Sequence, residues 1–146
     1  MKLKRVIIAV LVGATVLGAG AVAQSAFGSG AGPPTQVIVE RMGNGQTRTW
    51  IVTSPDTVAA LYRNVLGLPD AHLERLMCPA IASLYMYRLT FQDGSTTMLV
   101  AAYDPGGCRT VQLTPGGTRL VQGPNGEQFW TELQRVVGPE PAPQLP

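Results

Sequence analysis

Two cysteines, Cys78 and Cys108, and one histidine, His72, are the side chains of this sequence best suited to redox chemistry, metal binding or proton transfer. The cysteines stand thirty positions apart, whereas redox-active dithiols typically have two residues between them. If the cysteines are bonded to each other, one histidine is left, which is too few ligands for zinc. We therefore predict no metal site and no cofactor.

The remaining polar residues suggest structural roles rather than catalysis. His72 lies between acidic neighbours on an expected surface, where a histidine is usually solvated rather than a general base. Ser54 precedes a proline in a helix-start pattern and is expected to cap the helix with its side-chain oxygen. Ser95 lies in a turn, and the sequence contains no G-x-S-x-G motif. Asp93 and Asp104 precede glycine-containing turns, where aspartate bonds its own backbone. We predict that the protein is not an enzyme.

The first residues have the profile of an export signal. A basic start is followed by an uncharged apolar run from Val6 to Ala23, which closes on small residues. We expect cleavage between Ala23 and Gln24, so that residues 1–23 are a signal peptide and the protein is secreted. The alternative is an uncleaved single-pass membrane anchor, because a run of this length can just span a thin bilayer. In both cases the rest of the chain faces outward.

If the chain is exported, its two cysteines lie in an oxidising compartment. An even, minimal pair in an oxidising compartment is typical of a structural bridge. The sequence therefore predicts a disulfide between Cys78 and Cys108.

The charge of the chain argues against nucleic acid as a partner. Three of the 11 basic residues lie in the leader and none of the 9 acidic residues does, so the processed chain has eight basic and nine acidic residues. The eight are arginines scattered along the chain, whereas phosphate binding needs a concentrated positive face.

Composition divides the chain into segments. Residues 24–35 combine glycines with consecutive prolines and are expected to be a flexible linker, and residues 138–146 are a proline-rich tail expected to be disordered. Residues 36–137 are enough for one core, and we expect a single domain there.

Hydrophobic periodicity predicts the elements of this domain. A strand pair turns at Asn44-Gly45, and a helix follows from Pro55 to Gly67. Residues 69–77 suggest a short helix or an ordered loop. Four strands with short turns then span residues 84–122, the third of them from Cys108 to Leu113, and predict an antiparallel meander.

A second helix should begin at Asn125, whose side chain is expected to cap it. Two amphipathic helices on one face of an antiparallel sheet give a two-layer α+β fold, consisting of the N-terminal hairpin, the four-strand meander and one disulfide. Aromatic residues alternate along the strands and are interpreted as filling the core and the sheet faces rather than as a ligand platform: Trp50, Tyr85, Tyr87 and Tyr103.

Two resemblances bear on function. The segments Cys78-Pro79-Ala80, Tyr87–Phe91, Gly107–Val111 and Phe129–Leu133 form a pattern that resembles a group of small exported proteins and lipoproteins of GC-rich Gram-positive bacteria. This resemblance spans about 60 residues. It implies the domain boundary and the disulfide, and it implies no activity.

The run Met77-Cys78-Pro79-Ala80-Ile81, with Cys108 thirty positions later, is similar to the reactive loop of subtilisin-inhibitor-like proteins. That similarity implies that a serine protease would attack the bond between Ala80 and Ile81. The chain departs from the family in lacking its second disulfide and the Tyr-Asp-Pro expected after Ile81, and in adding a C-terminal helix.

Two classes of function therefore remain. The first is an exported, non-catalytic binding or structural domain, with an extracellular protein as a possible partner. The second is a serine-protease inhibitor with the reactive bond Ala80-Ile81.

Overall fold

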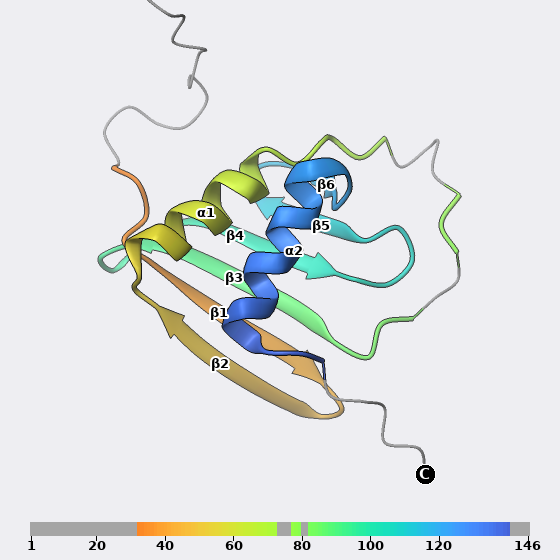
Figure 1. Cartoon of the computed structure of the whole chain (residues 1–146), viewed down its shortest axis with the longest axis horizontal. Helices are drawn as coiled ribbons and strands as arrows, with labels where there is room; N and C mark the ends of the chain where they lie inside the picture. Colours follow the sequence, from red (N-terminus) through yellow and green to blue (C-terminus); the bar gives the residue numbers. More distant parts are fainter. Residues whose placement is uncertain (1–31, 73–76, 80–81, 141–146) are drawn as a thin grey trace, which may run out of the picture.

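The computed structural model describes residues 32–72, 77–79 and 82–140. The elements follow one another as β1 (Gln36–Gly43), β2 (Gln46–Val52), α1 (Pro55–Leu66), β3 (Met86–Asp93), β4 (Thr96–Asp104), β5 (Thr110–Thr114), β6 (Thr118–Leu120) and α2 (Gly123–Val137). The strands form one sheet in the order β2-β1-β3-β4-β5-β6, with every pair antiparallel. Both helices cover the same face of this sheet (Figure 1). The predicted two-layer α+β fold is confirmed.

The N-terminal hairpin turns where the sequence places it. Asn44 and Gly45 both have positive φ, 50° and 71°, which is the conformation a two-residue hairpin turn requires. The pairing sets Val39 opposite Trp50 and Arg41 opposite Arg48. Val37, Val39 and Arg41 are buried beneath the helices, so the hairpin presents its odd-numbered β1 residues to the core.

Helix α1 begins at Pro55 and buries Val58, Leu61 and Val65 against the sheet. Ser54 occupies the predicted N-cap position, but its side chain forms no cap hydrogen bond. Its hydroxyl instead accepts a hydrogen bond of 3.3 Å from the hydroxyl of Thr57. The position of the helix start is therefore as predicted, and the predicted capping bond is wrong.

The chain after α1 closes one edge of the sheet. The N–H of Leu120 donates to the carbonyl of Pro69, and the N–H of Ala71 donates to the carbonyl of Thr118, so residues 69–71 run alongside β6. Arg119 reinforces this contact through a 2.6 Å ion pair with Asp70. Residues 69–72 are not helical, and residues 73–76 lie outside the described part of the chain.

The meander β3–β6 keeps the predicted alternation of faces. Tyr87, Leu89 and Phe91 are fully buried on the helix side, while Met86 and Arg88 are exposed on the other. β5 begins at Thr110 and not at Cys108 as predicted, because Gly107 and Arg109 have positive φ, 52° and 53°, which is incompatible with an extended strand.

The start of α2 corrects another prediction. The helix begins at Gly123, with Pro124 in its first turn and Gln122 at the N-cap position. Asn125 is therefore already inside the helix, and its side-chain amide donates a 2.7 Å hydrogen bond to the carbonyl of Gly67 at the end of α1. The side chain predicted to cap α2 instead links the two helices.

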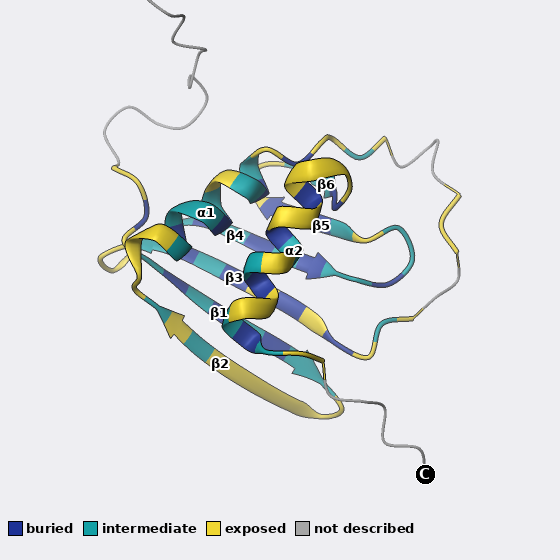
Figure 2. Ribbon diagram, in the orientation of Figure 1, coloured by how far each residue is buried: buried dark blue, intermediate teal, exposed yellow. Residues whose placement is uncertain are grey.

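A single apolar core lies between the helices and the sheet (Figure 2). Val37, Leu89 and Phe91 from the sheet meet Leu61 from α1 and Phe129 from α2 there. The face of the sheet away from the helices has no covering layer among the described residues. No helix in the described part of the chain is both long and apolar enough to cross a membrane.

Candidate functional site

The predicted disulfide is present. Cys78 and Cys108 are bonded, and their Cα atoms lie 4.9 Å apart. Cys108 belongs to the turn between β4 and β5, and the Oδ1 of Asp104 accepts a 2.8 Å hydrogen bond from the N–H of Gly106 within this turn. Arg109 follows Cys108, and its Nε donates to the hydroxyl of the buried Tyr103 at 3.4 Å. The bridge therefore attaches the segment before β3 to a turn that is itself fixed to the core.

The segment held by this bridge projects into solvent. Met77 is 99 % exposed, and Cys78 and Pro79 are exposed as well. A Cβ atom on Gly107 would lie 3.4 Å from the carbonyl oxygen of Pro79, so the segment passes close over the turn.

Several sequence-predicted site residues fall outside the described part of the chain. Ala80 and Ile81, the expected reactive bond of an inhibitor, do so, as do Ala23 and Gln24 at the expected cleavage site. His72 is described and exposed. Within the described residues, no three histidine, cysteine, aspartate or glutamate side chains gather where they could hold a metal ion.

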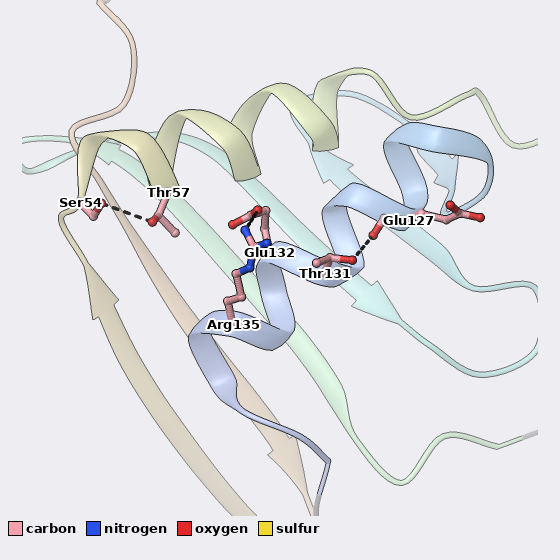
Figure 3. A network of polar contacts seen from close by, with 6 residues as sticks. All are labelled: Ser54, Thr57, Glu127, Thr131, Glu132 and Arg135. Atoms are coloured by element: carbon pink, nitrogen blue, oxygen red, sulfur yellow. Dashed lines mark hydrogen bonds and ion pairs between the residues drawn. The ribbon is translucent and has the colours of Figure 1, made fainter.

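An open depression of about 320 Å³ runs along the outer face of α2. Its lining comes from this helix alone: Pro124, Glu127, Gln128, Thr131, Glu132 and Arg135. Figure 3 shows the polar contacts there, in which Arg135 pairs with Glu132 and the hydroxyl of Thr131 donates to the carbonyl of Glu127. These bonds join residues three or four positions apart within one helix, as on any exposed helix surface, so they do not indicate a binding site.

Arg41 is a charged side chain that is buried, which is uncommon in proteins. It points into the helix side of the sheet and is only 5 % exposed. Its guanidinium carbon lies 5.3 Å from the ring centre of Trp50 and 5.3 Å from that of Tyr85, so the charge is held between two aromatic rings. Its NH1 atom is buried and has no hydrogen-bond partner among the described residues.

Tyr87 links this arginine to the C-terminal segment. It lies directly opposite Arg41 in the β1–β3 pairing, and its hydroxyl donates a 2.9 Å hydrogen bond to the Glu140 carboxylate. Burial raises the pKa of Tyr87, and the hydrogen bond and charge of Glu140 raise it further, while Arg41 opposes the shift. Tyr87 therefore remains a neutral donor between a carboxylate and a guanidinium.

Arg41 and Glu140 were not among the sequence-predicted site residues. The signal for Arg41 was present, because Val37, Val39 and Arg41 stand at alternate positions of one strand and must share a face. Nothing in the sequence indicated that Glu140 contacts the sheet, because it lies in the segment whose composition suggests a disordered tail. Its contact with Tyr87 joins residues 53 positions apart.

Comparisons of the chain with family models, with curated proteins and with solved structures gave no match.

Proposed function

We propose that the chain is an exported, non-catalytic domain that binds another protein through the segment around Cys78. The observation that carries this proposal is the disulfide, which fixes the exposed residues 77–79 to the β4–β5 turn. A segment that is held covalently loses less conformational entropy on binding than a free loop does. The leader and the oxidised cysteine pair both favour export.

The export part of the proposal is tested by the mass of the secreted protein. Expression of the full chain in a Gram-positive host should give a product in the medium that begins at Gln24 and has no thiol accessible to alkylation before reduction. A product that begins at Met1 and stays with the membrane contradicts cleavage. Two alkylated cysteines without reduction contradict the bridge.

The second candidate is a serine-protease inhibitor with the reactive bond Ala80-Ile81. The specific observation in its favour is the position of the anchor, because Cys78 and Pro79 are tethered and solvent-exposed directly before that bond. Protease inhibitors of this kind present a pre-ordered, extended segment to the enzyme, and the ordering is supplied by the scaffold.

Titration of the secreted protein against a subtilisin-type protease tests this candidate. Inhibition should reach completion at one inhibitor per enzyme, and Ala80→Pro should abolish it, while Ser95→Ala in the β3–β4 turn should leave it unchanged. If the protease is unaffected by the wild-type protein, or degrades it rapidly, the inhibitor proposal is wrong. The broader proposal of a binding domain would survive that result.

A further inference from the structure

The buried guanidinium of Arg41 leaves part of its hydrogen-bonding capacity unused. Arg41 is 5 % exposed, and burying a charged group without full hydrogen bonding destabilises a protein. The rings of Trp50 and Tyr85 compensate only in part. Both rings attract the positive charge, but their faces are weak acceptors for the N–H groups of the guanidinium.

The edge of a guanidinium has a defined chemical preference. Its planar N–H groups match the two oxygens of a carboxylate, and such charge-assisted pairs are among the strongest hydrogen bonds in proteins. NH1 has no such acceptor among the described residues, although it is shielded from water. The guanidinium thus lies near two aromatic rings and keeps one buried nitrogen, NH1, for which the described part of the chain supplies no acceptor.

A carboxylate of the chain itself already lies close by. Gly138 ends α2 with a φ of 75° and turns the chain, which then passes over the C-terminal end of β1 (Figure 1). Two residues later, Glu140 accepts the hydrogen bond from Tyr87. Arg41 lies opposite Tyr87 in the β1–β3 pairing, so its guanidinium and the Glu140 carboxylate are both near that hydroxyl, yet NH1 has no hydrogen-bond partner among the described residues.

We propose that Arg41, Trp50, Tyr85 and Tyr87 form a binding site for a glutamate or aspartate side chain carried on an extended peptide, and that Glu140 of this chain occupies its entrance. The segment Pro139-Glu140 then competes with the partner peptide for the site. A partner peptide takes the place of Glu140 at the Tyr87 hydroxyl and pairs with Arg41. This site is separate from the segment around Cys78, and its existence does not depend on the function proposed for that segment.

The proposal is tested by isothermal titration of the full chain with acetyl-Gly-Pro-Glu-Pro-amide, which copies residues 138–141. Glu140→Gln keeps a hydrogen-bond acceptor for Tyr87 but removes the competing charge. A tethered competitor acts at an effective concentration of about 1 mM, so a site with a Kd of about 0.1 mM for the peptide should bind it about tenfold more tightly in this variant than in the wild type. The matched peptide with Gln in place of Glu should not bind measurably.

Two further variants locate the site. Arg41→Met in the Glu140→Gln background keeps an apolar side chain of similar length and should abolish binding. Arg88→Gln, which removes an exposed arginine on the opposite face of the sheet, should leave binding unchanged. If Arg41→Met does not fold, Tyr87→Phe in the same background replaces it and should weaken binding at least about tenfold, by the loss of a hydrogen bond to a charged group.

Three results would overturn the proposal. The first is equal affinity of the wild type and Glu140→Gln for the glutamate peptide. The second is unchanged binding after Arg41→Met or Tyr87→Phe. The third is binding of inorganic phosphate to Glu140→Gln as tight as that of the glutamate peptide, which would indicate an unspecific anion site.

Discussion

The side chains on the helix face of the sheet are of two kinds, apolar ones and ones that carry polar atoms. Most are apolar and fill the core, but Arg41, Tyr87 and Tyr103 bring polar atoms into it. Each tyrosine has a partner for its hydroxyl, Glu140 for Tyr87 and Arg109 for Tyr103. Polar atoms at these positions are tolerated because the rings supply apolar area while the hydroxyl groups reach the rim of the core.

The two buried tyrosines predict how stability changes in alkali. Burial is the main cause that raises the pKa of both Tyr87 and Tyr103 above 10, the value that applies in the unfolded chain. Below about pH 10 each tyrosine is protonated in both states and stability does not depend on it. Above about pH 10 only the unfolded chain releases these protons, so the free energy of unfolding should fall by about 1.4 kcal/mol per pH unit for each tyrosine.

Urea unfolding at a series of alkaline pH values measures this slope. Tyr103→Phe should make the slope less steep, by up to about 1.4 kcal/mol per pH unit, since a phenylalanine has no proton to release. No lysine follows Lys4 in the sequence, so lysines of a processed chain do not titrate in the same range. A slope that is unchanged in the Tyr87→Phe/Tyr103→Phe double variant would contradict the assignment.

The environment of Arg41 could be predicted only in part from the sequence. Alternation along β1 places its side chain on the inner face, which could be predicted. The rings on either side come from β2 and from the residue before β3, and their approach depends on the pairing of three strands. Such a site is therefore recognisable only after the sheet has been assembled.

In α2, local sequence signals predict the presence of the helix more reliably than the residue at which it starts. Its apolar stripe predicted the helix, with Phe129, Leu133 and Val137 buried as expected of one face. Its start depends on tertiary contacts, because Gly126 lies directly against the backbone of Val121 and Asn125 bonds to Gly67. Neither contact is encoded in the capping pattern that suggested Asn125 as the N-cap.

The close approach at Gly126 yields a prediction for this helix. A Cβ atom at this position would lie 2.7 Å from the carbonyl carbon of Val121, which is backbone and cannot move aside freely. Alanine normally stabilises a helix by about 1 kcal/mol relative to glycine. Here we expect the opposite sign, with Gly126→Ala lowering the free energy of unfolding by about 1–3 kcal/mol through overpacking.

Chemical denaturation of Gly126→Ala checks the sign. Gln128→Ala, at an exposed position of the same helix, serves as control and should change stability by less than about 0.5 kcal/mol. An equal or higher stability of Gly126→Ala would mean that the first turn of α2 can shift away from Val121.

Local sequence patterns define the order of the strands in the sheet less well than they define the strands themselves. The hairpin and the meander could each be predicted from turns and alternation. Their joining, with β1 between β2 and β3, follows from burial, since Val37 and Val39 pair with Phe91 and Leu89 beneath the helices. Cys78, which stands between α1 and β3 in the sequence, is attached covalently to the turn between β4 and β5.

That attachment should contribute a large share of the stability of the whole domain. The bridge joins residues 30 positions apart, and closing a loop of this length restricts the unfolded chain by about 3–4 kcal/mol in the chain-entropy model. Domains of this size have a total stability of about 5–15 kcal/mol. The double variant Cys78→Ser/Cys108→Ser should therefore remain folded but unfold at a clearly lower urea concentration.

The dependence of stability on urea separates an effect on the unfolded chain from damage to the fold. Without the bridge the unfolded chain is more expanded, so the slope of the free energy of unfolding against urea should increase. Wild-type protein unfolded in the presence of a reductant should match the serine variant, because both lack only the crosslink. A loss below about 1 kcal/mol in both samples would mean that the bridge adds little to the contacts that already hold residues 69–71 against β6. The bridge would then serve chiefly to anchor the exposed segment before β3 and not to stabilise the domain.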